Sequence, residues 1–285
     1  MQNRSAEKTE REAEEKRKGN LFRLLQKTAA LLADAVFPPD IYCIACGRPI
    51  PAGEVYSLCS ECLQVILWAN GKLCRICGKP LEDWYPRDIC GECANRERSF
   101  DRGIKCVQYG TAERQILRDF KYRGKSWLAR ELAEIIYDKI SAVGLEFDII
   151  IPVPMYAAKE KERGYNQAAL LGMFLGRLSE RECRCDCLLR IRDTVPMNKL
   201  GARERRKNLD GAFRVTAEGR RIFPGKRILL IDDIYTTGTT AEHCSALMKA
   251  CGALDVTVAT VAAGRNQRKL PQVQIGEADQ QEREI

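Results

Sequence analysis

Apolar residues in the carboxyl-terminal two thirds of this chain follow two patterns. Short, mostly apolar runs occur at residues 103–110, 147–154, 187–191, 228–231 and 255–261, and they suit strands that are buried in a sheet. Helical spacing of apolar residues occurs instead at residues 116–140, in the last part of 147–178 and at residues 239–251. The first of these runs is broken near Gly124. Strands that alternate with helices in this way predict an α/β fold with a mostly parallel sheet, which binds ligands at the carboxyl ends of its strands.

The two ends of the chain depart from this pattern. Residues 1–20 contain six basic and five acidic side chains and no apolar core, which predicts a disordered charged tail and no signal peptide. Residues 21–36 have amphipathic spacing and precede two prolines, so we expect a helix there. Residues 265–285 form a second polar tail. No apolar run approaches the roughly 18 residues of a membrane helix, so we expect a cytoplasmic protein without membrane insertion.

Eight of the 14 cysteines form a repeat, in which each cysteine of the first half recurs 31 residues later, as from Cys43 to Cys74. Each half reads CxxC, twelve residues, CxxC, which is typical of a structural zinc site with four thiolates. The duplication predicts a double zinc-ribbon module at residues 37–98 with two Zn²⁺ ions. Pairing within each half is the simplest arrangement, and interleaved pairing stays open. The expected ligands are Cys43, Cys46, Cys59, Cys62, Cys74, Cys77, Cys90 and Cys93.

Three of the remaining cysteines alternate in CRCDC at residues 183–187. This alternation predicts a strand with three core thiols on one face and with Arg184 and Asp186 on the other, and we favour it over a metal site. His243 is the only histidine. We expect it on a helix surface, one turn beyond the loop described below, and not as a catalytic base.

The formal net charge of +8 is concentrated in one segment. Residues 181–227 contain fourteen Lys or Arg and six Asp or Glu, so this segment carries +8 by itself and the rest of the chain is neutral. Such a local excess favours a polyanionic partner, either a diphosphate or nucleic acid, over a merely solvated face.

The apolar run at residues 228–231 leads into two acidic residues and a turn rich in hydroxyl groups. Because a helix begins at this turn, free backbone N–H groups and the helix dipole suit a phosphate. Asp232 and Asp233 would repel a phosphate and suit a diol or Mg²⁺ instead. We therefore predict a site for a ribose 5-phosphate, and the absence of GxxxxGK[ST] and GxGxxG runs argues against P-loop and Rossmann sites. The residues expected around the phosphate are Thr236, Thr237, Gly238, Thr239 and Thr240.

This stretch resembles the phosphoribosyl pyrophosphate (PRPP) loop of type I phosphoribosyltransferases. Further motifs follow the order found in the ComF family: FKYRG at 120–124, PVP at 152–154, ERGYNQA at 162–168 and RDT…RERRKN…AF at 192–213. With the cysteine repeat in front, residues 20–263 resemble the competence-associated, phosphoribosyltransferase-like members of that family. The resemblance implies a type I phosphoribosyltransferase fold over residues 99–264.

The resemblance also implies roles for individual residues. The acid pair would face the ribose hydroxyls and the Mg²⁺ of PRPP, and residues 236–240 would hold the 5-phosphate. The turn after the strand at 147–154 corresponds to a pyrophosphate loop centred on Val153, Pro154 and Met155. Two sets of cations complete the expected site, one near the diphosphate and one on a loop that closes over it. These are Lys121, Arg123, Lys159 and Arg163 in the first set, and Arg203, Arg205, Arg206 and Lys207 in the second.

The chain departs at three places from the patterns of the proteins that it resembles. Met197 stands where the family usually has Gln, and Thr236 and Thr237 stand where purine-salvage enzymes have an acidic base. Gln2 stands where a glutamine-using amidophosphoribosyltransferase needs a nucleophilic cysteine, so we do not expect that activity. We expect a protein associated with competence and DNA uptake that binds PRPP and Mg²⁺ and transfers or senses phosphoribosyl groups. The alternative is a non-catalytic, zinc-containing protein that binds single-stranded DNA and competence proteins during transformation.

Overall fold

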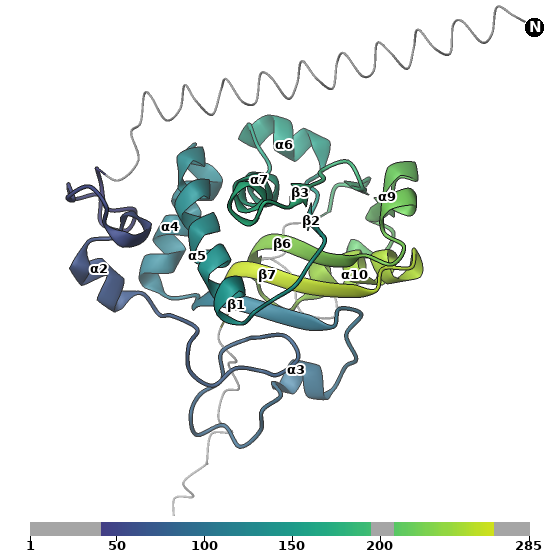
Figure 1. The fold of residues 1–285 in the computed structure, drawn as a ribbon, viewed down its shortest axis with the longest axis horizontal. Helices are drawn as coiled ribbons and strands as arrows, with labels where there is room; N and C mark the ends of the chain where they lie inside the picture. The colour runs from purple at the N-terminus through teal and green to yellow at the C-terminus, as the bar shows by residue number, and fades with distance from the viewer. Residues whose placement is uncertain (1–40, 195–207, 265–285) are drawn as a thin grey trace, which may run out of the picture.

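The computed structural model describes residues 41–194 and 208–264 (Figure 1). The predictions for both tails, for the helix at residues 21–36 and for Met197 lie outside the described residues. The same holds for the cationic loop, whose predicted residues are Arg203, Arg205, Arg206 and Lys207.

A five-stranded parallel sheet in the order β1-β7-β6-β2-β3 forms the centre of the protein. The middle strand β6 carries the apolar run at residues 228–231, which is completely buried as predicted. The predicted strand at residues 187–191 lies outside this sheet, because β4 pairs with β5 in a separate antiparallel ribbon. The strands are β1 (Arg102–Gln108), β2 (Ile149–Pro152), β3 (Glu182–Cys183), β4 (Leu188–Arg190), β5 (Phe213–Val215), β6 (Arg227–Tyr235) and β7 (Asp255–Ala263).

Helices cover both faces of the sheet, and the alternation of side chains along β6 separates the two cores. Leu229 and Ile231 pack with α4, α5 and α7 on one face, whereas Ile228 and Leu230 pack with α10 on the other. The helical run at 116–140 is broken at Gly124, as predicted, where φ is +68°. The helices are α4 (Thr111–Tyr122), η2 (Ser126–Leu128), α5 (Ala129–Ala142), α6 (Ala157–Arg163), α7 (Gln167–Ser179), α9 (Ala217–Ile222) and α10 (Thr239–Ala250).

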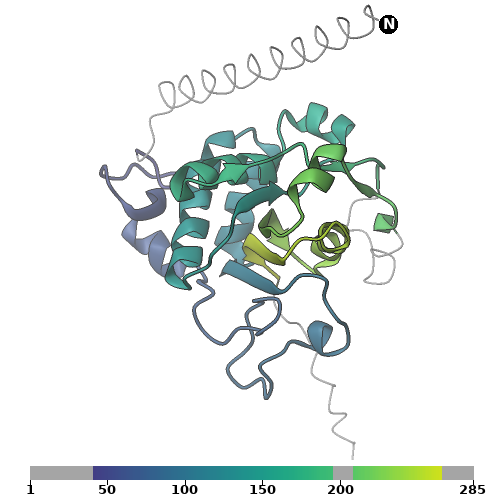
Figure 2. The ribbon, with the colours of Figure 1, turned by 45° about the vertical axis from the view of Figure 1, so that its right-hand side comes forward.

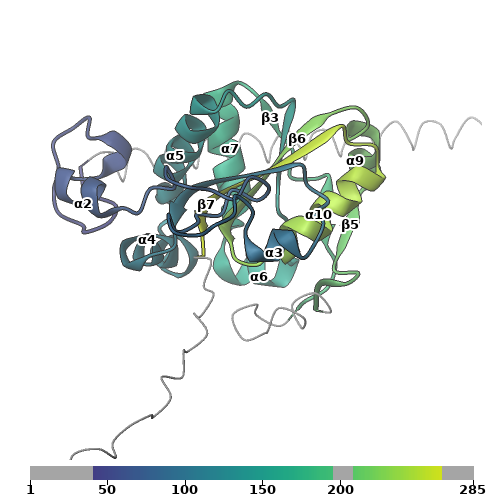
Figure 3. The same cartoon turned by 90° about the horizontal axis from the view of Figure 1, so that it is seen from below.

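The two halves of the cysteine repeat pack on different cores of the same sheet. The first ribbon, residues 41–70, contains η1 (Val55–Ser57) and α2 (Ser60–Val65) and packs beside α4 and α5 (Figures 1 and 2). The second ribbon, residues 71–99, contains α3 (Gly91–Ala94) and packs on the face that α10 covers (Figure 3). Between them the chain follows the edge of β1, where Trp68 bridges to Val107. The repeat therefore gives two separately placed ribbons.

The alternating cysteines at residues 183–187 do not form the predicted strand. β3 ends at Cys183. Arg184 and Asp186 were expected on the outer face of a longer strand. Instead they form an ion pair at 2.8 Å that closes a turn. Arg184 also contacts Glu218 at 2.7 Å. The Cys183 and Cys185 thiols still contact each other, but the three thiols differ in burial: Cys187 is fully buried, Cys183 is half-buried and Cys185 is exposed. His243 lies half-buried on α10, with Nε2 3.7 Å from an Asp210 oxygen.

Candidate functional site

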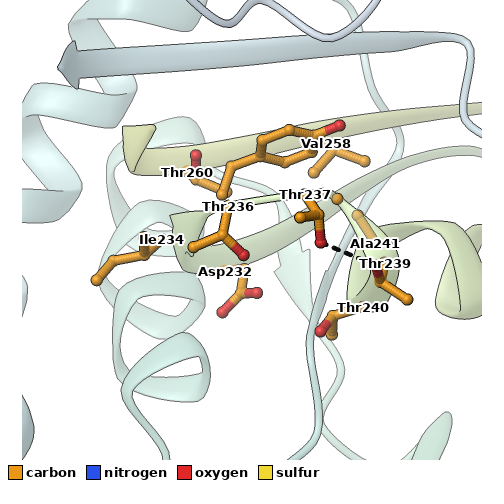
Figure 4. Close-up of a pocket in the computed structure, with 11 residues that line it drawn as sticks. Asp232, Ile234, Thr236, Thr237, Thr239, Thr240, Ala241, Val258 and Thr260 are labelled. Carbon is orange, nitrogen blue, oxygen red and sulfur yellow. Dashed lines mark hydrogen bonds between the residues drawn. The ribbon is translucent and has the colours of Figure 1, made fainter. Parts of the chain in front are cut away.

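An open pocket lies between the carboxyl end of β6 and the start of α10 (Figure 4). Gly238 lies at the N-terminus of α10 with φ of +76°, a conformation that other residues rarely adopt. A Cβ atom at this position would also lie 2.2 Å from the Tyr235 hydroxyl oxygen. The turn therefore requires glycine, as the sequence predicts. The pocket is lined by Asp232, Ile234, Tyr235, Thr236, Thr237, Gly238, Thr239, Thr240, Ala241, Val258 and Thr260.

Hydroxyl groups surround this turn. Thr237 and Thr239 share a hydrogen bond of 2.8 Å between their side chains, drawn as a dashed line in Figure 4. Thr236 is exposed and Thr240 half-buried, and both line the pocket beside them. The structure thus brings together four threonine hydroxyls at the N-terminus of a helix of 12 residues, where backbone N–H groups lack helical partners. This arrangement suits a phosphate group.

The two adjacent acids have different surroundings, because successive side chains of a strand point to opposite faces. Asp232 lines the pocket, and its Oδ1 accepts a hydrogen bond of 2.8 Å from the backbone of Asp233. Burial, together with the charge of Asp233, raises the pKa of Asp232 to about 7. Asp233 is buried and forms an ion pair of 2.9 Å with Lys121 of α4. Of the two acids, Asp232 alone lines the pocket, and the charges of Lys121 and Lys105 offset only part of the rise in its pKa.

The four cations predicted near a diphosphate all contact protein groups, and only Lys121 reaches the acid pair. The other three lie at the end of α4 or on α6, and none of the four lines the pocket. Their described contacts are Lys121 with Asp233 (2.9 Å), Arg123 with Asp119 (3.4 Å), Lys159 with the Asp193 carboxylate and with the Thr194 carbonyl (2.9 Å), and Arg163 with Gln167 (2.6 Å).

The turn after β2 lies at the same sheet edge as the pocket, because β2 and β6 are neighbours. Val153 is buried and donates a backbone hydrogen bond of 2.9 Å to Ile231, and Pro154 and Met155 are half-buried beyond it. Asn166 holds the turn from the other side, since its amide donates to the Val153 carbonyl at 3.0 Å while its oxygen caps α7. Sequence reasoning missed this role, although an N-cap residue in front of an apolar helix is a recognisable signal.

Sequence reasoning also missed the side chains that support the turn at residues 236–240, here called the threonine turn. Tyr235 is buried, and the completely buried Lys105 of β1 places its Nζ 4.2 Å from the centre of the Tyr235 ring. Phe100 meets the same ring edge-on, at 6.3 Å between ring centres. The one available signal was a lysine within an otherwise apolar strand.

The eight repeated cysteines form two clusters, each from one half of the repeat, so the pairing within halves is the observed one. In each cluster the sulfur atoms all lie within 4.8 Å of one another. Backbone N–H groups point at sulfur in both, from Cys59 to Cys43 at 3.4 Å and from Cys90 to Cys74 at 3.3 Å. Four thiols with N–H donors aimed at them fit a structural Zn²⁺. The second cluster is entirely buried, whereas Cys46 of the first is exposed.

Comparisons with known proteins agree with this architecture. A double zinc ribbon domain family matches residues 32–94, and a phosphoribosyl transferase domain family matches residues 177–280. The fold is therefore that of a type I phosphoribosyltransferase domain with an N-terminal double zinc ribbon. Within the described residues, no helix is both long enough and apolar enough to cross a membrane.

Curated relatives cover most of the chain. Competence protein F of Haemophilus influenzae is 32% identical over 221 residues, which cover 76% of this chain and 94% of the relative. DNA utilization protein YhgH of Escherichia coli is 27% identical over the same shares of the two chains. Competence protein ComFC of Bacillus subtilis is 26% identical over 78% of this chain and 88% of the relative. The chain therefore belongs to the ComF family of competence and DNA utilization proteins.

Proposed function

We propose that this protein binds PRPP with Mg²⁺ at the carboxyl end of β6. The observation that carries the proposal is the threonine turn around Gly238, which begins α10 directly beyond the pocket-facing Asp232. The turn would hold the 5-phosphate through backbone N–H groups and hydroxyls. Asp232 would meet the ribose hydroxyls or Mg²⁺, and the turn at Val153 would lie beside the diphosphate.

If the bound PRPP reacts, the bond between ribose C1 and the diphosphate oxygen breaks and an acceptor nucleophile bonds to C1. The diphosphate leaves with its electron pair, and positive charge develops on the ribose ring in the transition state. Mg²⁺, when bound, neutralises charge on the departing diphosphate. The protein contributes the orientation of the ribose through the threonine turn and Asp232. The two threonines at residues 236 and 237 provide no acidic base for a nucleobase acceptor.

Calorimetric titration with PRPP and Mg²⁺ tests this site directly. Asp232→Asn keeps the hydrogen bond from the Asp233 backbone but removes the charge that faces the pocket. Because charge-assisted contacts contribute about 1.5–3 kcal/mol, we expect affinity to fall about 10- to 100-fold. Asp148→Asn is the matched control, since Asp148 pairs with Arg227 at 2.9 Å at the opposite end of β6. No PRPP binding by the wild-type protein, or equal binding by Asp232→Asn, contradicts the proposal.

A second candidate function is the binding of single-stranded DNA. Tyr122 is 71% exposed at the end of α4, and the Arg163 guanidinium lies 4.9 Å from the centre of its ring. Beside it Arg123 is exposed and Lys125 half-buried, and both pair with Asp119. An exposed aromatic ring among cations is the arrangement on which bases stack without sequence preference. We expect the cations at residues 203–207 to contact the phosphate backbone of the DNA.

Fluorescence anisotropy with a labelled oligonucleotide tests this second function. We expect Tyr122→Ala to weaken binding about tenfold, because stacking on one aromatic ring contributes about 1–3 kcal/mol. Trp84→Ala is the control, since Trp84 is similarly exposed (64%) but lies on the second ribbon. Affinity should fall steeply as salt rises. The absence of binding at low salt would remove DNA from the functions of this chain.

A further inference from the structure

The second ribbon rests directly on the strand that supports the threonine turn. A backbone hydrogen bond of 2.8 Å joins Gly103 of β1 to Ile76 in the ribbon. A Cβ atom at Gly78 would lie 2.1 Å from the Gly103 oxygen, and one at Gly103 would lie 2.1 Å from the Cys77 oxygen. Two glycines thus allow the cysteine-bearing turn to contact the sheet backbone to backbone, so the ribbon and β1 have little freedom to move separately.

Two buried lysines connect this contact to Tyr235. Lys105 belongs to β1, and its Nζ lies 4.2 Å from the centre of the Tyr235 ring and donates to the Val258 carbonyl at 3.3 Å. Lys79 belongs to the ribbon, with its Nζ 5.9 Å from the same ring centre and 3.0 Å from Glu92. An ammonium group near an aromatic face is attracted to it, most strongly where water is excluded. The Tyr235 ring is therefore held by one cation from the sheet and one from the ribbon.

Tyr235 in turn positions the start of α10. Its hydroxyl lies directly against Gly238, and among the described residues this hydroxyl has no hydrogen-bond partner. A second connection reaches the first turn of the helix, because Glu242 accepts hydrogen bonds from the backbone and hydroxyl of Ser99, at 3.0 and 2.7 Å. Ser99 is the last residue of the second ribbon, whereas Tyr235 is the last residue of β6. They fix the place where the N–H groups of α10 meet a phosphate.

The first ribbon is attached elsewhere. Tyr56 donates a hydrogen bond of 2.6 Å to Asp138 of α5, and Lys139 of the same helix donates one of 2.7 Å to the Ala69 carbonyl. These contacts lie in the core on the other face of the sheet. The duplicated sequence therefore gives two ribbons of the same ligand chemistry, of which only the second adjoins the threonine turn.

Charge adds to this connection. Four deprotonated thiols around one Zn²⁺ carry two net negative charges. Lys79, Arg98 and Lys105 are buried around the second cluster and Tyr235, and Arg98 contacts the Cys93 thiol and Glu242. Loss of the metal or of a thiolate would remove part of the counter-charge of these cations, which is costly in a buried site. The cations and the Tyr235 ring would then have to rearrange.

We infer that the second ribbon is a positioning element of the phosphate-binding turn, with Tyr235 as the positioning residue, so that an intact Cys74–Cys93 cluster and bound PRPP stabilise each other. This inference rests on the PRPP site proposed above. The coupling is reciprocal by thermodynamic necessity: if the intact cluster strengthens PRPP binding, PRPP strengthens retention of the metal by that cluster. Within residues 41–194 and 208–264 the first cluster has no such connection to the threonine turn, so it serves as an internal comparison.

The test uses the full chain and follows Zn²⁺ release to a chromogenic chelator, with and without PRPP and Mg²⁺. Cys59→Ser leaves the second cluster as the metal site, and Cys90→Ser, its equivalent 31 residues later, leaves the first. We expect PRPP to slow release from Cys59→Ser at least about fivefold and to leave release from Cys90→Ser unchanged, a difference within the usual range of coupling between sites.

Two substitutions outside the clusters make the test independent of cysteine changes. Tyr235→Leu should retain both metals but bind PRPP at least about tenfold more weakly, and PRPP should no longer slow release. Tyr235→Phe keeps the ring between the two lysines and should restore the coupling. Tyr56→Phe removes the hydrogen bond that joins the first ribbon to α5, and it should change neither the affinity for PRPP nor the slowing of Zn²⁺ release by PRPP. This set remains informative if Cys90→Ser does not fold.

The outcomes separate this inference from the proposed function. If calorimetry shows that PRPP saturates the wild-type protein but release from the second cluster does not change, the inference is wrong and the PRPP site stands. Equal slowing at both clusters also overturns it, because it indicates general stabilisation. If PRPP does not bind at all, both proposals fail together.

Discussion

The two adjacent acids of β6 should have opposite effects on stability when their charges are removed. Asp232 forms no direct ion pair in the described structure and is only partly offset by the charges of Lys121 and Lys105, whereas Asp233 is paired with Lys121 at 2.9 Å. We predict that Asp232→Asn stabilises the ligand-free protein near pH 8 and that Asp233→Asn destabilises it. Asparagine is almost isosteric with aspartate, so packing changes little in either variant.

The magnitude for Asp232 follows from its pKa, which is raised from 3.8 to about 7 by burial and by the neighbouring charge. Because the folded chain holds this proton more tightly than the unfolded chain, the wild-type protein loses stability as the pH rises from about 4 to about 7. Each pKa unit corresponds to about 1.4 kcal/mol, which gives an upper limit on the order of 4 kcal/mol. Asp232 keeps some access to the pocket, and solvent there reduces the gain expected from Asp232→Asn to about 2 kcal/mol.

Asp233→Asn leaves a nearly buried ammonium group without its partner. Burial lowers the pKa of Lys121, and the charge of Asp233 outweighs this and raises it, so the pair depends on both charges. Breaking a buried pair costs about 3–5 kcal/mol, and because the Lys121 side chain is 21% exposed we expect about 2 kcal/mol.

Urea unfolding at about pH 5 and about pH 8, without PRPP or Mg²⁺, measures both differences. The advantage of Asp232→Asn should be larger at the higher pH, because the wild-type carboxylate must be ionised there. If Asp232→Asn is no more stable than the wild-type protein near pH 8, the reasoning about the buried carboxylate is refuted. Equal losses in the two variants would refute it as well.

Two further predictions concern the turn and the ribbons. Gly238→Ala should lower the melting temperature and weaken PRPP binding at least about tenfold, because φ is +76° and the new Cβ would meet the Tyr235 hydroxyl. The control for both measurements is Gly71→Ala, since Gly71 has open space around it. Metal analysis should find two Zn²⁺ per chain. The Cys59→Ser variant should lose one Zn²⁺, and its first ribbon should unfold before the rest of the protein because the first cluster is the more exposed one. Iron, or no metal, would contradict the zinc assignment.

The sequence predicted the parts of the fold that depend on local patterns. The four apolar residues at 228–231 identify the central strand because a run buried on both faces leaves no polar side. The positive φ of Gly238 follows from its place between a strand and a helix. The two CxxC spacings identify the four sulfur atoms of each cluster because the metal imposes the same short turn twice.

Features that depend on distant contacts could not be predicted in this way. A 31-residue repeat suggests one compact module. Which core each ribbon joins depends on distant contacts, namely the close backbone approach of Gly78 to Gly103 and the hydrogen bond from Tyr56 to Asp138. The alternation at residues 183–187 was misinterpreted because an ion pair from Arg184 to a residue in α9, Glu218, closes a turn there. Nor does the sequence show that Lys121 contacts Asp233 in the ligand-free protein.

Three features that cost stability lie together at one end of the sheet. At the amino end of β6, Asp148 pairs with Arg227, and nearby Asp101 pairs with Lys249, as expected where only folding matters. Three groups lie at the carboxyl end of the sheet: the Asp232 carboxylate with its raised pKa, the fully buried Lys105, and the Tyr235 hydroxyl, which has no hydrogen-bond partner among the described residues. A scaffold without a ligand would gain stability from apolar replacements at these three positions. Their presence together beneath and beside the threonine turn therefore argues that this end of the sheet is a binding site, and that the second ribbon is part of it.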